Sequence, residues 1–217
     1  QVLTVRFHRY EITADFAHRM NIANVDKFIF VSDYIRREAI MKFGLPEDKT
    51  MVIAINVDLP ALFQTNIELA PQLRGVDRRD ILLMVGFNTI NKGLHRAVQL
   101  FEMLKASHPK LKLVIKGETP FEHKWLHKLP QEVEHYEKTI AQAQPHIEAG
   151  DMVRLPADSM MAETYMAAGW VLSLSDYEGC HTAVAEGGIY GCVPLALNWP
   201  GIEDVYPEVE SVQSIEA

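Results

Sequence analysis

The stretch SDYEGCHTAVAE, residues 175–186, places two glutamates, Glu178 and Glu186, eight positions apart. The apolar run Trp170–Ser175 leads into it and is typical of a buried strand, and Val193–Leu197 predicts the next strand. A helix is expected between them, with Glu178 in the loop before it and Glu186 on its first turns. In such a unit, ligands bind beyond the carboxyl ends of the strands, and free N–H groups at a helix start suit phosphate.

The rest of the chain alternates strand-like and helix-like segments in the same way. Four-and-three spacing of apolar residues predicts a helix from Leu94 to Leu104, and Ser32 or Asp33 caps another that Gly44 closes. Alternation at this spacing predicts an α/β protein with Rossmann-like parallel sheets flanked by helices. The other strands are expected at Val2–Phe7, Val25–Val31, Met51–Ile55, Ile81–Val85, Leu111–Ile115 and Met152–Leu155, and the other helices at Ala14–Ile22, Gln131–Gln144 and after Asp158 or Ser159.

Composition excludes several classes of function. The 217 residues carry a net charge of -8, which argues against a nucleic-acid partner because such a partner needs a basic face. Two cysteines form no disulfide framework, and no apolar run approaches the roughly 20 residues that a bilayer requires. We therefore expect a soluble, cytoplasmic protein, and peripheral contact with the inner face of the membrane stays open. A start at Gln1 inside a strand-like run suggests a piece of a longer protein.

Metal and thiol chemistry have weak support in the sequence. His123 and His127 stand four positions apart, a spacing that zinc sites use on helices, yet no third ligand stands out. Cys180 has no His/Asp partner pattern of the kind a nucleophile needs, so its thiol is expected to pack. We expect neither a bound metal nor another cofactor.

A series of short motifs, in order along the chain, carries a resemblance to a known family. The order resembles that of the GT-B glycosyltransferases of family four, whose signature is an E-x7-E pair. The motifs are Phe30-Val31-Ser32, Asn56-Val57-Asp58, Val85-Gly86, Lys92-Gly93, Ser175 to Gly179 with Glu186, Gly191 to Pro194 and Pro200-Gly201.

The resemblance implies two Rossmann-like domains, the first binding most of the acceptor and the second binding the nucleotide sugar. Residues 1–68 are similar to the end of the first domain, 69–79 form a linker, and 80–217 are similar to most of the second. Both ends look truncated relative to the family.

The resemblance also implies roles for single residues. Glu186 corresponds to the glutamate that binds the ribose hydroxyls, and Glu178 to the one beside the donor sugar. Lys92 corresponds to the lysine on the donor diphosphate, and His8 to the histidine that reaches the sugar from the first domain. Glu178 and His8 are thus the expected catalytic residues. The remaining expected donor-binding positions are Gly86, Gly93, Gly179, Cys180, His181 and Thr182.

One position departs from the family pattern. Phe87 follows Gly86 where the family usually has arginine. The departure weakens the expected clamp on the diphosphate, and it leaves either Asn88 as a substitute partner or a reduced activity.

The expected function is transfer of a sugar, with retention, from a nucleotide-diphosphate sugar to a saccharide, lipid or other hydroxyl acceptor, as in polysaccharide biosynthesis. Phe87 and the truncation keep a second hypothesis open, a non-catalytic nucleotide-sugar binding module or inactive homologue. A GT-B epimerase or a phosphorylase is a weaker alternative.

Overall fold

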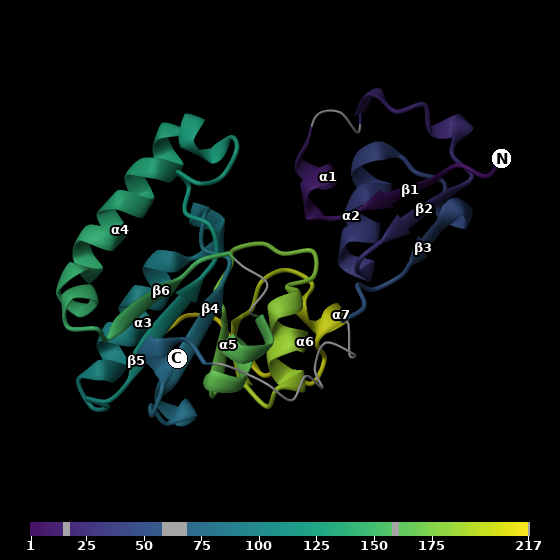
Figure 1. Ribbon diagram of the computed structural model, residues 1–217. Coiled ribbons are helices and arrows are strands. Elements are labelled where there is room, and N and C mark those ends of the chain that lie inside the picture. Colours follow the sequence, from purple (N-terminus) through teal and green to yellow (C-terminus); the bar gives the residue numbers. More distant parts are fainter. Residues whose placement is uncertain (15–17, 58–68, 158–160, 217) are drawn as a thin grey trace. The chain divides into compact units, whose positions relative to one another are not determined.

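The computed structural model describes residues 1–14, 18–57, 69–157 and 161–216 (Figure 1). The chain divides into two compact units. The first unit holds residues 1–56, 177–182 and 198–210, and the second holds residues 57–176, 183–197 and 211–217. Segments 177–182 and 198–210 thus belong to the first unit although strands of the second flank them in sequence. The predicted linker, 69–79, lies in the second unit, and the predicted domain boundaries stay predictions.

The first unit is a parallel sheet with helices packed against it. Its strands pair in the order β1-β2-β3, and its buried core is mainly aromatic and aliphatic, with Phe7, Phe28 and Phe30 from the sheet and Ile35 from a helix. The elements are β1 (Thr4–Phe7), α1 (Arg9–Thr13), β2 (Lys27–Phe30), α2 (Asp33–Phe43), β3 (Thr50–Val52) and α7 (Ile202–Val205).

The predicted caps of α2 are confirmed. The Ser32 hydroxyl accepts a hydrogen bond of 3.4 Å from the Ile35 amide, and Gly44 follows the helix with a φ of +64°. Serine satisfies an otherwise free amide at the helix start, and glycine takes the left-handed conformation at little cost.

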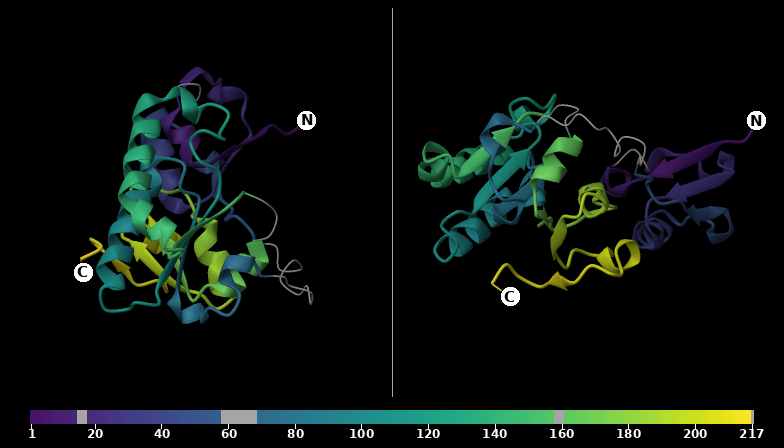
Figure 2. Two further views of the ribbon diagram at one scale, coloured as in Figure 1. Left: turned by 60° about the vertical axis from the view of Figure 1, so that its left-hand side comes forward. Right: turned by 60° about the horizontal axis from the view of Figure 1, so that its bottom comes forward.

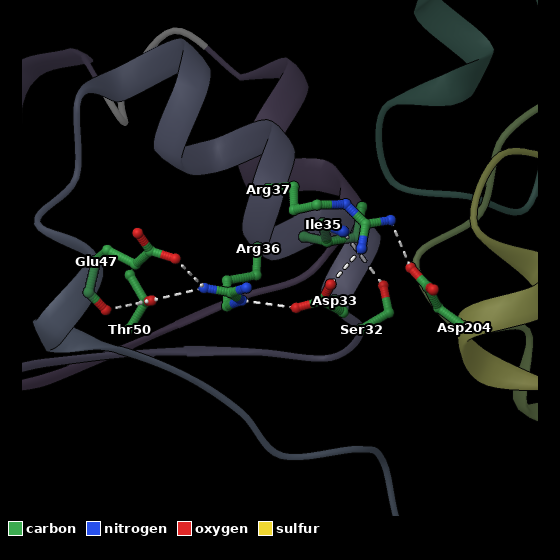
Figure 3. Close-up of polar contacts among 8 residues, drawn as sticks. All are labelled: Ser32, Asp33, Ile35, Arg36, Arg37, Glu47, Thr50 and Asp204. Carbon is green, nitrogen blue, oxygen red and sulfur yellow. Dashed lines mark hydrogen bonds and ion pairs between the residues drawn. The ribbon is translucent and has the colours of Figure 1, made fainter.

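Side chains of α2 hold the neighbouring segments of this unit together (Figure 3). Asp33 pairs with both Arg36 and Arg37, and its hydrogen bond with Arg36 is the main cause that lowers the pKa of the Asp33 carboxyl. The Arg37 guanidinium also forms a 2.8 Å ion pair with Asp204, the next-to-last residue of α7. Arg36 contacts the Thr50 hydroxyl at the start of β3. The network connects α2 to β3 and to segment 198–210.

The structure near the N-terminus differs from the sequence prediction. The polar segment after β1 forms α1, in which the Glu11 carboxylate accepts a 2.7 Å hydrogen bond from the His8 amide at the helix start. The predicted helix Ala14–Ile22 does not form among its described residues, where short 3-10 turns occur instead. Residues 15–17 lie outside the described residues.

The second unit is the larger parallel sheet, ordered β6-β5-β4-β7-β8-β9. β4 lies between β5 and β7, so the order along the chain reverses at the β4–β7 pair. In open α/β sheets, this reversal is where ligands bind. The elements are β4 (Ile81–Val85), α3 (Leu94–Lys105), β5 (Lys112–Lys116), α4 (Pro130–Glu148), β6 (Met152–Leu155), α5 (Met161–Ala167), β7 (Trp170–Ser173), α6 (Thr182–Ile189), β8 (Val193–Leu197) and β9 (Ser211–Val212).

Helices cover both faces of this sheet (Figures 1 and 2). Leu82 and Leu113 contribute to a core with residues of α3 and α4, whereas Leu83 and Val171 contribute to a second core with residues of α5 and α6. Neighbouring positions of β4 thus face opposite layers, as the pleat of a strand dictates. The predicted α/β class is confirmed.

Most element boundaries agree with the sequence prediction to within two residues. The strand predicted at Met51–Ile55 is shorter and spans Thr50–Val52. The helix predicted to end at Gln144 continues through Pro145 to Glu148. The predicted cap at Asp158 or Ser159 lies outside the described residues.

Candidate functional site

The loop after β4, residues 86–93, brings three predicted donor-binding residues together; we call it the β4 loop. Gly86 and Gly93 both have left-handed backbone, with φ of +73° and +78°. The Lys92 side chain lies over Gly86, since its Cε stands 3.8 Å from the point where a Cβ on that glycine would be. The Gly86 amide donates to the Lys116 carbonyl of β5 at 2.9 Å, which fixes the start of the loop.

The end of the β4 loop is fixed against the residues that follow β7. A Cβ on Gly93 would stand 2.3 Å from the Leu174 carbonyl oxygen, so only glycine fits at this contact. The Arg96 guanidinium donates to the same carbonyl at 2.7 Å and pairs with Asp176. The Asp176 amide in turn donates to the Asn91 carbonyl at 3.0 Å. These contacts fix Lys92 at the carboxyl edge of β4 and β7.

Phe87 is part of the core rather than of a diphosphate clamp. Its side chain is 2% exposed and its ring stacks on Tyr136 of α4, with centroids 6.3 Å apart. The position after Gly86 therefore contributes hydrophobic anchoring where an arginine would contribute a charge. Phe87, the residue that departs from the family pattern, thus packs in the core.

Glu186 lies on α6 with its carboxylate oriented by a residue that the sequence analysis missed. The Tyr165 hydroxyl of α5 donates a 2.6 Å hydrogen bond to Glu186 Oε2, and the buried Tyr165 ring stacks on Tyr190. This bond fixes one carboxylate oxygen, and the half-buried side chain retains further acceptor capacity. No local pattern connects positions 165 and 186, so their hydrogen bond could not be found from spacing.

The loop after β7, residues 177–182, belongs to the first unit; we call it the β7 loop. The Tyr177 hydroxyl donates a 3.0 Å hydrogen bond to Glu38 of α2, and the Arg9 guanidinium lies over the Tyr177 ring. A Cβ on Gly179 would stand 3.1 Å from the Arg9 amide nitrogen, which leaves little room for a side chain. Contacts of the first unit thus hold this loop.

The remaining predicted residues of the β7 loop are mostly buried. Glu178 and His181 are each 7% exposed. The Tyr206 hydroxyl donates to the His181 carbonyl at 2.9 Å and lies 3.7 Å from Cys180 Sγ. Burial raises the pKa of the Cys180 thiol, which agrees with a packing role. Thr182 begins α6.

His8 belongs to the same unit as Glu178. It precedes α1, and its side chain is 48% exposed with Nδ1 3.7 Å from Glu11 Oε2. The two predicted catalytic residues therefore lie in the first unit, whereas Lys92 and Glu186 lie in the second.

A cavity of about 280 Å³ opens at the carboxyl ends of β5 and β6 in the second unit. Lys116, 2% exposed, lines it and donates to the Pro156 carbonyl at 3.1 Å. Arg154 lines it too, and its ion pair with Glu122 holds the pKa of that carboxyl at about 2. Neither cation is among the residues predicted from the sequence, although Lys116 is the last residue of β5 and Arg154 the next-to-last of β6.

The histidine pair considered for metal binding is arranged differently from a helical site. His127 lies within the short 3-10 turn Leu126–Lys128, and its Nδ1 stands 3.0 Å from the His123 carbonyl oxygen. Among the described residues, no three His, Cys, Asp or Glu side chains gather as a metal ion would require. None of the described helices combines the length and the apolar character that a membrane span requires.

Comparison with protein families gives one match. Residues 66–210, more than half of the chain, match the family model described as "Glycosyl transferases group 1". Among the curated proteins that were compared, none matches significantly.

Solved structures share the fold at low sequence identity. HepE of Anabaena, in complex with UDP and glucose, superimposes with a TM-score of 0.69 at 15% identity, over 93% of this chain and 54% of its own. A glycosyltransferase of Rickettsia africae gives 0.66 at 18% identity, over 92% and 52%. WaaG, involved in lipopolysaccharide biosynthesis, gives 0.62 at 16% identity, over 82% and 45%. This chain thus spans about half the length of these relatives.

Proposed function

Because the chain belongs to the glycosyl transferases group 1 family, we propose that its protein transfers a sugar from a nucleotide-diphosphate sugar to a hydroxyl acceptor. The observation that carries the proposal is the β4 loop, in which Lys92 lies over Gly86 at the carboxyl edge of β4 and β7. The resemblance to family four further suggests retention of the anomeric configuration, with a saccharide or lipid as acceptor.

Lys92 is suited to the diphosphate end of such a donor. When the glycosyl–phosphate bond breaks, the leaving diphosphate gains negative charge, so a fixed cation and free amides lower the barrier. Lys92 supplies the cation, and free amides in the first turn of α6 supply hydrogen bonds. In this proposal the diphosphate needs no bound metal, and turnover should survive a chelator.

Glu186 is suited to the ribose. A carboxylate accepts hydrogen bonds from two adjacent hydroxyls, and the Tyr165 hydroxyl fixes its orientation before any ligand binds. Pre-organisation of this kind reduces the entropy that binding costs.

The cavity at the ends of β5 and β6 is suited to the base. Lys116 donates there to the Pro156 carbonyl, and a flat base could use the backbone groups of residues 154–156. HepE binds UDP in its solved complex, which makes UDP the first nucleotide to test.

Glu178 and His8 are proposed to act at the donor sugar. Glu178→Gln removes the charge with little change in shape, so turnover should fall while the affinity for the nucleoside diphosphate is retained. Full turnover of this variant would remove Glu178 from the mechanism.

The buried Phe87 favours one alternative function, a nucleotide-sugar binding module without turnover. Such a module lacks the arginine charge that the family uses at this position, and it would bind donors without releasing free nucleotide. The two functions therefore differ in a single measurable product.

The test combines binding with turnover. We expect one of UDP, GDP and ADP to raise the Tm well above the other two, because stabilisation follows affinity. The matching nucleotide sugar, incubated with the protein and an acceptor panel, should then release free nucleotide. Stabilisation without release indicates the binding module, and the absence of stabilisation by all three contradicts the proposed function.

A further inference from the structure

Helix α4 contacts the β4 loop at two points. The Glu132 carboxylate, in the first turn of α4, accepts a 2.7 Å hydrogen bond from the Ile90 amide, and the Tyr136 ring one turn later stacks on Phe87. We infer that Glu132 is a positioning residue that holds Lys92 where the donor diphosphate binds. The inference rests on the proposed function, since it assumes that Lys92 contacts a diphosphate.

The Ile90 amide needs an external partner. Residues Ile90–Lys92 form a 3-10 turn, and the first amides of such a turn have no acceptor within it. A side chain directly before the turn usually supplies one, but Thr89 makes no such bond. Glu132, 42 positions away, takes its place. Lys92 is the last residue of this turn, so the capping bond restricts the path of its backbone.

Helix α4 can hold Glu132 still because it is itself fixed on α3. Glu102 of α3 accepts a 2.8 Å hydrogen bond from Gln142 and lies 3.6 Å from His146. Nearer the start of α4, His135 Nε2 lies 3.0 Å from His95 Nδ1 of α3. These contacts attach α4 to α3 over most of its length.

The negative charge of Glu132 allows a positioning role to be distinguished from direct electrostatic repulsion of the diphosphate. A carboxylate near an anionic ligand repels it, so removing Glu132 should strengthen diphosphate binding if charge alone mattered. A positioning role predicts the opposite sign for Glu132→Ala. Glu132→Gln keeps an acceptor oxygen and should restore most of the lost affinity.

The experiment is a set of titrations of the protein with UDP, GDP and ADP, each compared with its nucleoside. Glu132→Ala should bind its preferred diphosphate about three- to tenfold more weakly than wild type, as expected for a disturbed charge-assisted contact, with nucleoside affinity unchanged. Glu132→Gln should stay within about twofold of wild type. Glu134→Ala removes an equal charge from an exposed position of α4 and serves as the control.

Lys92→Ala distinguishes a failure of the proposed function from a failure of the positioning role of Glu132. If Lys92→Ala leaves diphosphate affinity unchanged, or no diphosphate binds wild type, the proposed function fails and the inference fails with it. If Lys92→Ala weakens binding but Glu132→Ala does not, or both Glu132 variants bind more tightly, only the positioning role is overturned. The double variant should bind no more weakly than Lys92→Ala alone.

Hydrogen exchange checks the same contact without a ligand. In Glu132→Ala the Ile90 amide should exchange faster while amides of β4 keep their protection. Unchanged exchange at Ile90 would contradict the capping bond, even in a variant of reduced stability.

Discussion

The β4 loop and the β7 loop follow adjacent strands of one sheet, yet they are held in different ways. The β4 loop is fixed within the second unit, by the close approach of Gly93 to Leu174 and by the bond from Ile90 to Glu132. The β7 loop belongs to the first unit, where Tyr177 bonds to Glu38. We propose a division of labour between the two loops, with Lys92 of the β4 loop required for diphosphate affinity and Glu178 of the β7 loop required for turnover.

The largest expected effect comes from placing a side chain in the β4 loop. Gly93→Ala forces a Cβ against the Leu174 carbonyl and gives alanine a left-handed backbone, so the free energy of unfolding should fall by about 3 kcal/mol or more. Chemical denaturation measures this loss.

Gly188→Ala in α6 is the matched control for that prediction. A Cβ there would meet nothing within 4 Å, so alanine should stabilise the helix by about 0.5–1 kcal/mol. Equal losses in both glycine variants would show that the contact with Leu174 is not what fixes the β4 loop.

A smaller effect should follow from loosening the β7 loop. Tyr177→Phe removes a hydroxyl that donates to the Glu38 carboxylate, and the free energy of unfolding should fall by about 1.5 kcal/mol. Diphosphate affinity should stay at the wild-type value while turnover decreases. A large loss of diphosphate affinity in Tyr177→Phe would contradict the division of labour. Tyr190→Phe, which removes a tyrosine hydroxyl from the second unit, is the comparison variant.

The smallest effect concerns pH and the start of α3. Burial lowers the pKa of His95 below its ordinary value, and Arg96 and His135 act in the same direction while Asp176 opposes them. Below about pH 6.5 the unfolded chain therefore takes up a proton that the folded chain does not. The free energy of unfolding consequently decreases as the pH is lowered, until His95 protonates in the folded state as well.

His95→Gln should make the free energy of unfolding less dependent on pH between pH 7.5 and pH 5.5. Urea denaturation at three pH values measures the slope, and a slope identical to that of wild type would remove His95 from this account.

The sequence predicted what local patterns encode. The apolar run Ile81–Val85 coincides with β4, because buried parallel strands are continuously apolar. The run Val193–Leu197 likewise coincides with β8. Parallel pairing of adjacent strands also explains why residues after β4 and β7 meet at one edge. The strand pattern thus placed Lys92 at that edge, while its role stays a prediction.

Contacts between distant positions could not be predicted in this way. The bond between Tyr165 and Glu186 joins residues 21 positions apart, and that between Ile90 and Glu132 joins residues 42 apart. Each bond depends on how elements that are distant in the sequence pack together. The spacing of residues within one helix does not predict such packing. Phe87 is a similar case, because its burial depends on Tyr136 in α4.

The most direct test of the central claim is the affinity of Lys92→Ala for the diphosphate that stabilises the wild-type protein, measured by titration calorimetry. Loss of a charge-assisted bond should weaken binding about tenfold or more, with nucleoside affinity retained. Lys138→Ala, which removes an exposed lysine from α4, should bind as wild type does. Equal affinities of Lys92→Ala and wild type would contradict the account of the β4 loop as the diphosphate site.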